Sequence, residues 1–120
     1  MALFPITETD RRIYETQLND FLPQEIFDIR SHLWLESFWA TPQSADLRAV
    51  SWPYLVARDN SAADLAESYR LLFPGRRVVP MVFANPEPND DLALHNGYVR
   101  RSAEAQGYPA LYFSHPSQSA

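Results

Sequence analysis

The feature that most limits how this chain can fold is the alternation of short apolar runs with longer helical segments. The apolar runs lie at 26–29, 78–83 and 110–114, and they are rich in β-branched and aromatic residues, as strands are. Helical patterns at 61–73 and 89–106 separate them. This order predicts an α/β fold with right-handed crossovers and about three parallel strands joined by two crossover helices.

A leading helix is expected at 7–22, before the first strand. Thr7 with Asp10 three residues later is close to a capping box, and Pro23 ends the pattern. The apolar side chains that share one face of this helix are Tyr14, Leu18, Phe21 and Leu22. In the last helix, Val99 and Ala103 are expected to point inward, whereas His95 is placed on a solvated side with no function.

Composition limits the kinds of partner and chemistry. The chain has 120 residues, the usual size of one domain, and a formal net charge of -5, which argues against a nucleic-acid partner. It has no cysteine, and all ten basic residues are arginine, so thiolate and lysine chemistry are excluded within it. Neither a transmembrane run nor a secretory signal is present, so a cytoplasmic protein without membrane contact is expected.

The end of the first strand carries the most suggestive polar residues. In Asp28-Ile29-Arg30-Ser31-His32, positions 30 and 32 project to the same side of a strand. Two histidines at this spacing would share a divalent metal ion, but an arginine has no lone pair to donate. His32 alone is therefore either one metal ligand or a histidine that hydrogen-bonds to the backbone or to water.

The segment 35–60 has no clear period of either kind and is expected to be an aromatic insertion after the first strand. Such an insertion either lines a substrate pocket or packs locally. The pocket candidates are Trp34, Trp39, Trp52 and, after the last strand, His115. Acidic residues at the helix starts are read as caps; they are Asp59, Asp64, Asp90 and Asp91.

Several segments, taken in order, resemble the N-terminal part of the amidohydrolase-related, metal-dependent hydrolases. The segments that carry the resemblance are 9–15, 21–23, 26–34, 69–75, 79–83 and 96–99. The resemblance implies a (β/α)8 TIM barrel and a divalent metal, zinc by preference, that activates water against an amide, ester or lactone of a small-molecule substrate; some relatives decarboxylate instead. His32 matches the second histidine of the family's first-strand pair, and Arg30 stands at the first. No catalytic residue of the family falls within the chain.

A closed barrel of this kind takes roughly 250 residues. The expectation is therefore an incomplete (β/α)8 TIM barrel that forms a single partial domain over 1–120, with the leading helix at 7–22, the first strand at 25–34, the insertion at 35–60 and the remaining βαβ part at 61–115. Two functions stay open. One is a fragment of a metal-dependent hydrolase, inactive by itself. The other is a non-catalytic interaction module that binds a partner, or a second copy as a homo-oligomer, through its exposed sheet.

Overall fold

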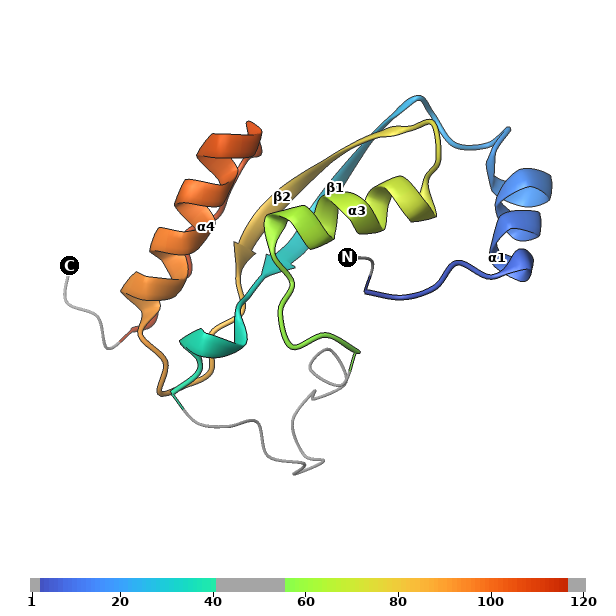
Figure 1. Ribbon diagram of the computed structural model, residues 1–120. Helices are drawn as coiled ribbons and strands as arrows, with labels where there is room; N and C mark the ends of the chain where they lie inside the picture. The colour runs from blue at the N-terminus through green and yellow to red at the C-terminus, as the bar shows by residue number, and fades with distance from the viewer. Residues whose placement is uncertain (1–2, 41–55, 117–120) are drawn as a thin grey trace.

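A computed structural model describes residues 3–40 and 56–116. Two parallel strands, β1 (Glu25–Leu33) and β2 (Arg77–Ala84), form the sheet. The helices are α1 (Glu8–Ile13), α3 (Ala62–Leu72) and α4 (Leu92–Gln106). A π-helical turn, η1 (Tyr14–Leu18), continues α1, and a 3-10 turn, η2 (Glu36–Phe38), follows β1. Figure 1 shows α3 crossing in front of the two strands and α4 standing beside β2.

The helices begin where the polar caps lie. Thr7 and Asp10 form a reciprocal capping box at α1, and Ser61 and Asp64 form the same box at α3. Asp91 caps α4 by accepting from the amides of Ala93 and Leu94. Gly107 ends α4 in the left-handed conformation, with φ at 69°, which glycine adopts without a steric penalty.

A β-bulge interrupts the parallel pairing of β1 with β2. Asp28 pairs with Pro80 and Ser31 pairs with Val82, so β1 advances three residues while β2 advances two. The irregularity starts opposite Pro80, which has no amide hydrogen to donate to the ladder. Side-chain alternation therefore restarts at Ser31, and Ser31 and Leu33 are both buried.

The core lies on the face of the sheet that α3 and α4 cover (Figure 1). Its buried side chains are Leu33, Ala62, Leu65, Val82, Ala84, Val99 and Ala103, and Tyr69, Tyr98 and Tyr108 pack against them. The cluster draws on both strands and both helices, so burial of these side chains holds the βαβα unit together.

We call the opposite side of the sheet the open face. By alternation with the buried positions, it consists of Phe27, Ile29, Arg30, His32, Val79, Met81 and Phe83. Phe27 is 55% exposed and Ile29 is 66% exposed, so no described element packs closely on the β1 part of this face.

The expected incomplete TIM barrel with about three strands is wrong. The chain is a small mixed α/β structure with two parallel strands in the part that the structure describes. The segment expected as a third strand makes a single bridge, between Ala110 and Val82. Two features limit it: Pro109 has no amide hydrogen, and the Asn96 side chain bonds the backbone N and O of Phe113 at 3.0 and 2.8 Å in place of a strand.

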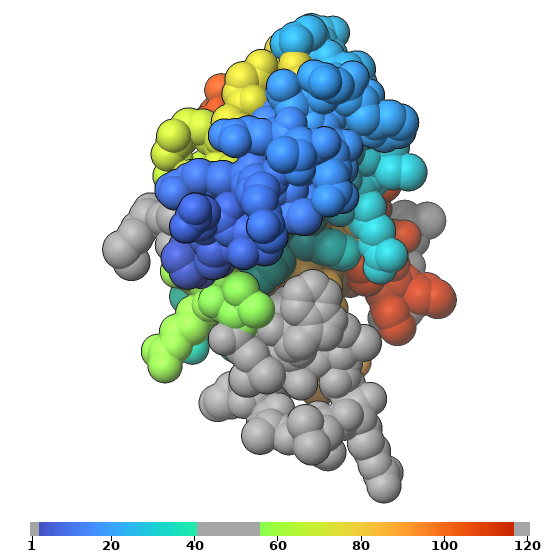
Figure 2. All heavy atoms as spheres, turned by 90° about the vertical axis from the view of Figure 1, so that its right-hand side faces the viewer, coloured from blue at the N-terminus to red at the C-terminus, as the bar shows by residue number. Residues whose placement is uncertain are grey.

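The leading helical segment lies at the amino ends of the strands, beside the turn that follows α3. The Tyr14 hydroxyl donates to the Pro74 carbonyl at 2.8 Å, and the Arg76 guanidinium bonds the backbone and side-chain oxygens of Asn19. Figure 2 shows the N-terminal residues, in blue, covering the upper part of the side that faces the viewer. The regular helix ends sooner than the sequence pattern suggests, because the π-helical turn replaces its last part.

None of the described helices is long and apolar enough to cross a membrane.

Truncating the core should cost far more stability than truncating an exposed leucine. Leu33 is 1% exposed, so Leu33→Ala should lower the free energy of unfolding by about 2 to 5 kcal/mol. Leu94→Ala, at a side chain that is 41% exposed, should lower it by less than about 1 kcal/mol. Urea denaturation followed by circular dichroism measures both. Equal losses in the two variants would contradict this placement of the core.

Candidate functional site

His32 and the end of β2 meet at the carboxyl ends of the two parallel strands. The His32 Nδ1 lies 3.1 Å from the Ala84 carbonyl oxygen, and its ring lies 4.2 Å from the Phe83 ring. Because a carbonyl oxygen only accepts, Nδ1 carries the proton and Nε2 keeps its lone pair. Backbone bonding through one ring nitrogen is the arrangement that orients metal-binding histidines in proteins.

The surroundings of His32 favour its neutral form. Burial lowers the pKa of His32 below its usual value, and the positive charge of Arg30 lowers it further, while the bond to Ala84 opposes both effects. The neutral imidazole is the form that gives a lone pair to a metal ion or accepts a hydrogen bond.

A hydrogen-bonded group on the helix side of β1 holds the bulge. Asp28 accepts from the Arg30 amide at 3.0 Å and from the Tyr69 hydroxyl at 2.7 Å, and the Ser31 and Tyr69 hydroxyls lie 2.7 Å apart. Burial raises the pKa of Asp28, but these hydrogen bonds outweigh it and hold the pKa below its usual value. Burial also raises the pKa of Tyr69. The charged carboxylate thus fixes the backbone from which Arg30 and His32 project.

The aromatic pocket candidates do not gather around His32 in the described residues. Trp34 is buried, its indole nitrogen points to the Ala57 carbonyl at 3.4 Å, and its backbone pairs with Asn60. Trp34 therefore packs inside the protein, and its pairing with Asn60 joins the two ends of the segment that follows β1. Trp39 is half-buried beyond η2, and Trp52 lies outside the described residues.

His115, expected to face the mouth at the strand ends, lies beside the start of α4. It is exposed and lines a pocket of about 510 Å³ at the start of α4, together with Asp90, Asp91 and Phe113. Three acidic residues, Glu87 among them, and one histidine line this pocket. No group of three ligating side chains suited to a metal ion occurs in residues 3–40 and 56–116. His32 is therefore at most one ligand, and Arg30 beside it repels a cation.

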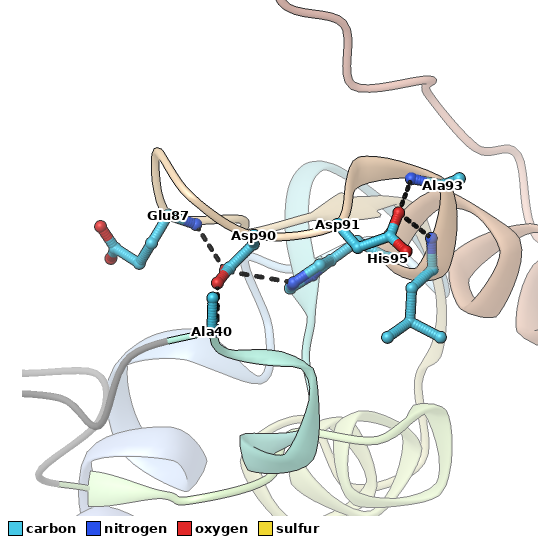
Figure 3. Close-up of polar contacts among 7 residues, drawn as sticks. Ala40, Glu87, Asp90, Asp91, Ala93 and His95 are labelled. Carbon is cyan, nitrogen blue, oxygen red and sulfur yellow. Dashed lines mark hydrogen bonds and ion pairs between the residues drawn. The ribbon is translucent and has the colours of Figure 1, made fainter.

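The sequence analysis missed a buried acid–histidine pair. Asp90 and His95 have side chains that are each 1% exposed, and Nε2 of His95 lies 3.2 Å from Oδ2 of Asp90. Asp90 also accepts from the amides of Ala40, at 2.7 Å, and Glu87, at 2.8 Å (Figure 3). The expected solvated side for His95 is wrong. His95 precedes the inward Val99 by four residues, so the helical period already placed it on the buried face.

The Asp90 carboxylate joins three separate segments. They are the stretch after η2 that ends at Ala40, the loop before α4 that contains Glu87, and α4 itself through His95. Phe38 adds edge-on ring contacts to His95 and Tyr98 at 5.5 and 5.4 Å. This acidic residue was expected to be a helix cap, but Asp91 is the cap and Asp90 fastens the connections at the carboxyl ends of the strands.

Searches of family models, curated proteins and solved structures found no match to this chain.

Removing the Asp90 carboxylate should destabilise the protein strongly. Asp90→Ala leaves two amides without their acceptor and removes the carboxylate beside the buried His95 ring, so the free energy of unfolding should fall by about 3 kcal/mol. Asp20→Ala, at an exposed position, is the matched control and should change it by less than about 0.5 kcal/mol. Urea denaturation at neutral pH measures both. A loss at Asp90 no larger than at Asp20 would show that the carboxylate does not fasten these segments.

The lowered pKa of His32 predicts a pH-dependent contribution to stability. Because the folded-state pKa lies below the unfolded value of about 6.5, this contribution is present above that pH and is lost as the pH falls through the folded-state pKa. The wild-type protein should therefore lose more stability between neutral pH and mild acid than His32→Gln, which does not titrate. Urea denaturation in buffers with a chelator measures the difference. Parallel pH profiles for the two proteins would contradict it.

Proposed function

We propose that this chain contributes a metal ligand, His32, to an amidohydrolase-like, metal-dependent hydrolase site whose other ligands come from outside the described residues. A metal ion at such a site activates water for attack on an amide, ester or lactone of a small-molecule substrate. By itself the described part of the chain is expected to be inactive, because it supplies one ligand and no complete donor set.

The observation that supports this proposal is the way His32 is held. The Ala84 carbonyl fixes the tautomer and the ring orientation, which leaves the Nε2 lone pair for a metal ion. The histidine stands at the carboxyl end of β1, and ligands of parallel α/β proteins bind outside the carboxyl ends of strands. The ordered resemblance of 26–34, 69–75 and 79–83 to the hydrolase family is consistent with this placement.

Zinc binding tests the proposal directly. Isothermal titration of the full chain with zinc should show binding that is lost in His32→Ala and kept in His115→Ala, which removes a histidine at the other pocket. Arg30→His removes a fixed positive charge and adds an imidazole two residues from His32, so zinc should bind at least about tenfold more tightly. An unchanged zinc affinity in both His32→Ala and Arg30→His would refute the proposal.

A second candidate function is a non-catalytic interaction module that buries its open face against another polypeptide. The specific observation is the exposure of Phe27 and Ile29, two large apolar side chains on neighbouring positions of one sheet face. Contiguous exposed apolar patches, unlike single exposed side chains, mark binding sites for protein partners.

If the open face serves binding, its exposed residues should matter little to folding. Ile29→Thr keeps a β-branched side chain and should change the free energy of unfolding by less than about 1 kcal/mol. Thermal denaturation of the isolated chain measures this change. A loss as large as that of a core variant would show that the Ile29 side chain packs inside the chain itself and is not available to a partner.

A further inference from the structure

β1 has a free edge as well as an open face. Within the described residues β1 (Glu25–Leu33) pairs with β2 along one side. Two of its other backbone groups already have side-chain partners, because the His32 carbonyl accepts from Asn60 at 2.9 Å and the Arg30 amide donates to Asp28. The free part of the edge in the described structure is therefore the stretch before the bulge, 25–29, where the outward backbone groups are available to a further strand. Extended peptides bind proteins by adding to such an edge, with backbone bonds for affinity and alternate side chains for specificity.

Apolar side chains lie next to this edge, and a single cation, Arg30, stands among them. Phe27 and Ile29 precede Arg30 on the open face, and His32 follows it. The Arg30 side chain has no ion pair or side-chain hydrogen bond to another residue in 3–40 or 56–116, and the residue is exposed. Its backbone amide, in contrast, is fixed by Asp28 in the bulge. The backbone is thus held while the guanidinium stays available.

The charge on this face selects among possible occupants. In a symmetric dimer through the open face, neither copy would offer a carboxylate to the Arg30 of the other, because the open face contains no acidic residue. Asp28, the nearest acid in sequence, points to the helix side and is bonded to Tyr69. Both copies would also carry the net charge of -5. A second copy is therefore disfavoured.

An occupant with a carboxylate among apolar side chains matches the face. A guanidinium binds a carboxylate through two parallel hydrogen bonds, which gives both strength and geometric selectivity. β-Branched or aromatic neighbours of that carboxylate would cover Phe27 and Ile29.

We propose that the free edge and open face of β1 bind an extended segment of a partner protein, in which an acidic side chain flanked by apolar residues pairs with Arg30. This inference rests on the interaction function proposed above and names its partner's chemistry. It requires no metal ion at His32.

Peptide selection on the intact chain tests the inference. A phage-displayed library of random peptides is selected on the immobilised 120-residue protein, and the enriched sequences are compared with those selected on Arg30→Gln. Arg101→Gln, an exposed arginine of α4, is the matched control bait. The wild type and the control should enrich peptides with an Asp or Glu between β-branched or aromatic residues, and Arg30→Gln should not.

The best enriched peptide is then made synthetically, together with a version in which its acid is replaced by the corresponding amide. Fluorescence anisotropy should show about fivefold weaker binding for either the amide peptide or Arg30→Gln, with little further loss when the two are combined. Amide shifts in ¹⁵N spectra should concentrate at Glu25–Leu33.

The outcomes separate the inference from the function on which it rests. Peptides that shift the β1 amides but carry no acid preference would overturn the role of Arg30 and leave the interaction function standing. No enrichment, or shifts confined to other elements, would overturn both. An additive effect of the amide peptide and Arg30→Gln would also overturn the proposed pairing, because the two groups would then act independently.

Discussion

The one-residue bulge in β1 determines which side chains of that strand reach the core and which face outward. Without it, the alternation that places Asp28 beside Tyr69 would send Ser31 and Leu33 to the open face. With it, Leu33 closes the core and His32 points away from it. Pro80 removes a donor opposite the bulge, and within the bulge the Asp28 carboxylate accepts the Arg30 amide hydrogen. The fold and the candidate site therefore depend on the same local irregularity.

Local signals in the sequence were sufficient for parts of the fold. The caps at Thr7, Ser61 and Asp91 and the apolar period of α4 place the helices, because each depends on residues within a few positions. The mixed α/β character follows from the alternation of strands and helices. The bulge was not predictable in this way, since it depends on Tyr69, which lies 41 positions from Asp28.

The sequence-based expectations that failed also involve contacts between residues that are distant in sequence. The apolar run near Ala110 has the composition of a strand. Whether it pairs depends on Pro109 and on the Asn96 side chain, which hydrogen-bonds to the backbone N and O of Phe113. Polarity led to the placement of His95 on the surface, whereas its helical position and the distant Asp90 bury it. At the candidate site, the sequence identified His32 and Arg30, but only the structure shows which nitrogen of His32 is occupied and that the Trp34 indole points to the Ala57 carbonyl.

The Asp90 contacts combine a local and a long-range constraint in one side chain. The carboxylate joins amides at Ala40 and Glu87, so one of its bonds spans fifty positions of sequence and another only three. The short bond closes a local loop, whereas the long one holds together two connections that are distant in sequence, at a larger cost in chain entropy. The same carboxylate therefore fixes both a local turn and the arrangement of distant segments at the carboxyl ends of the strands.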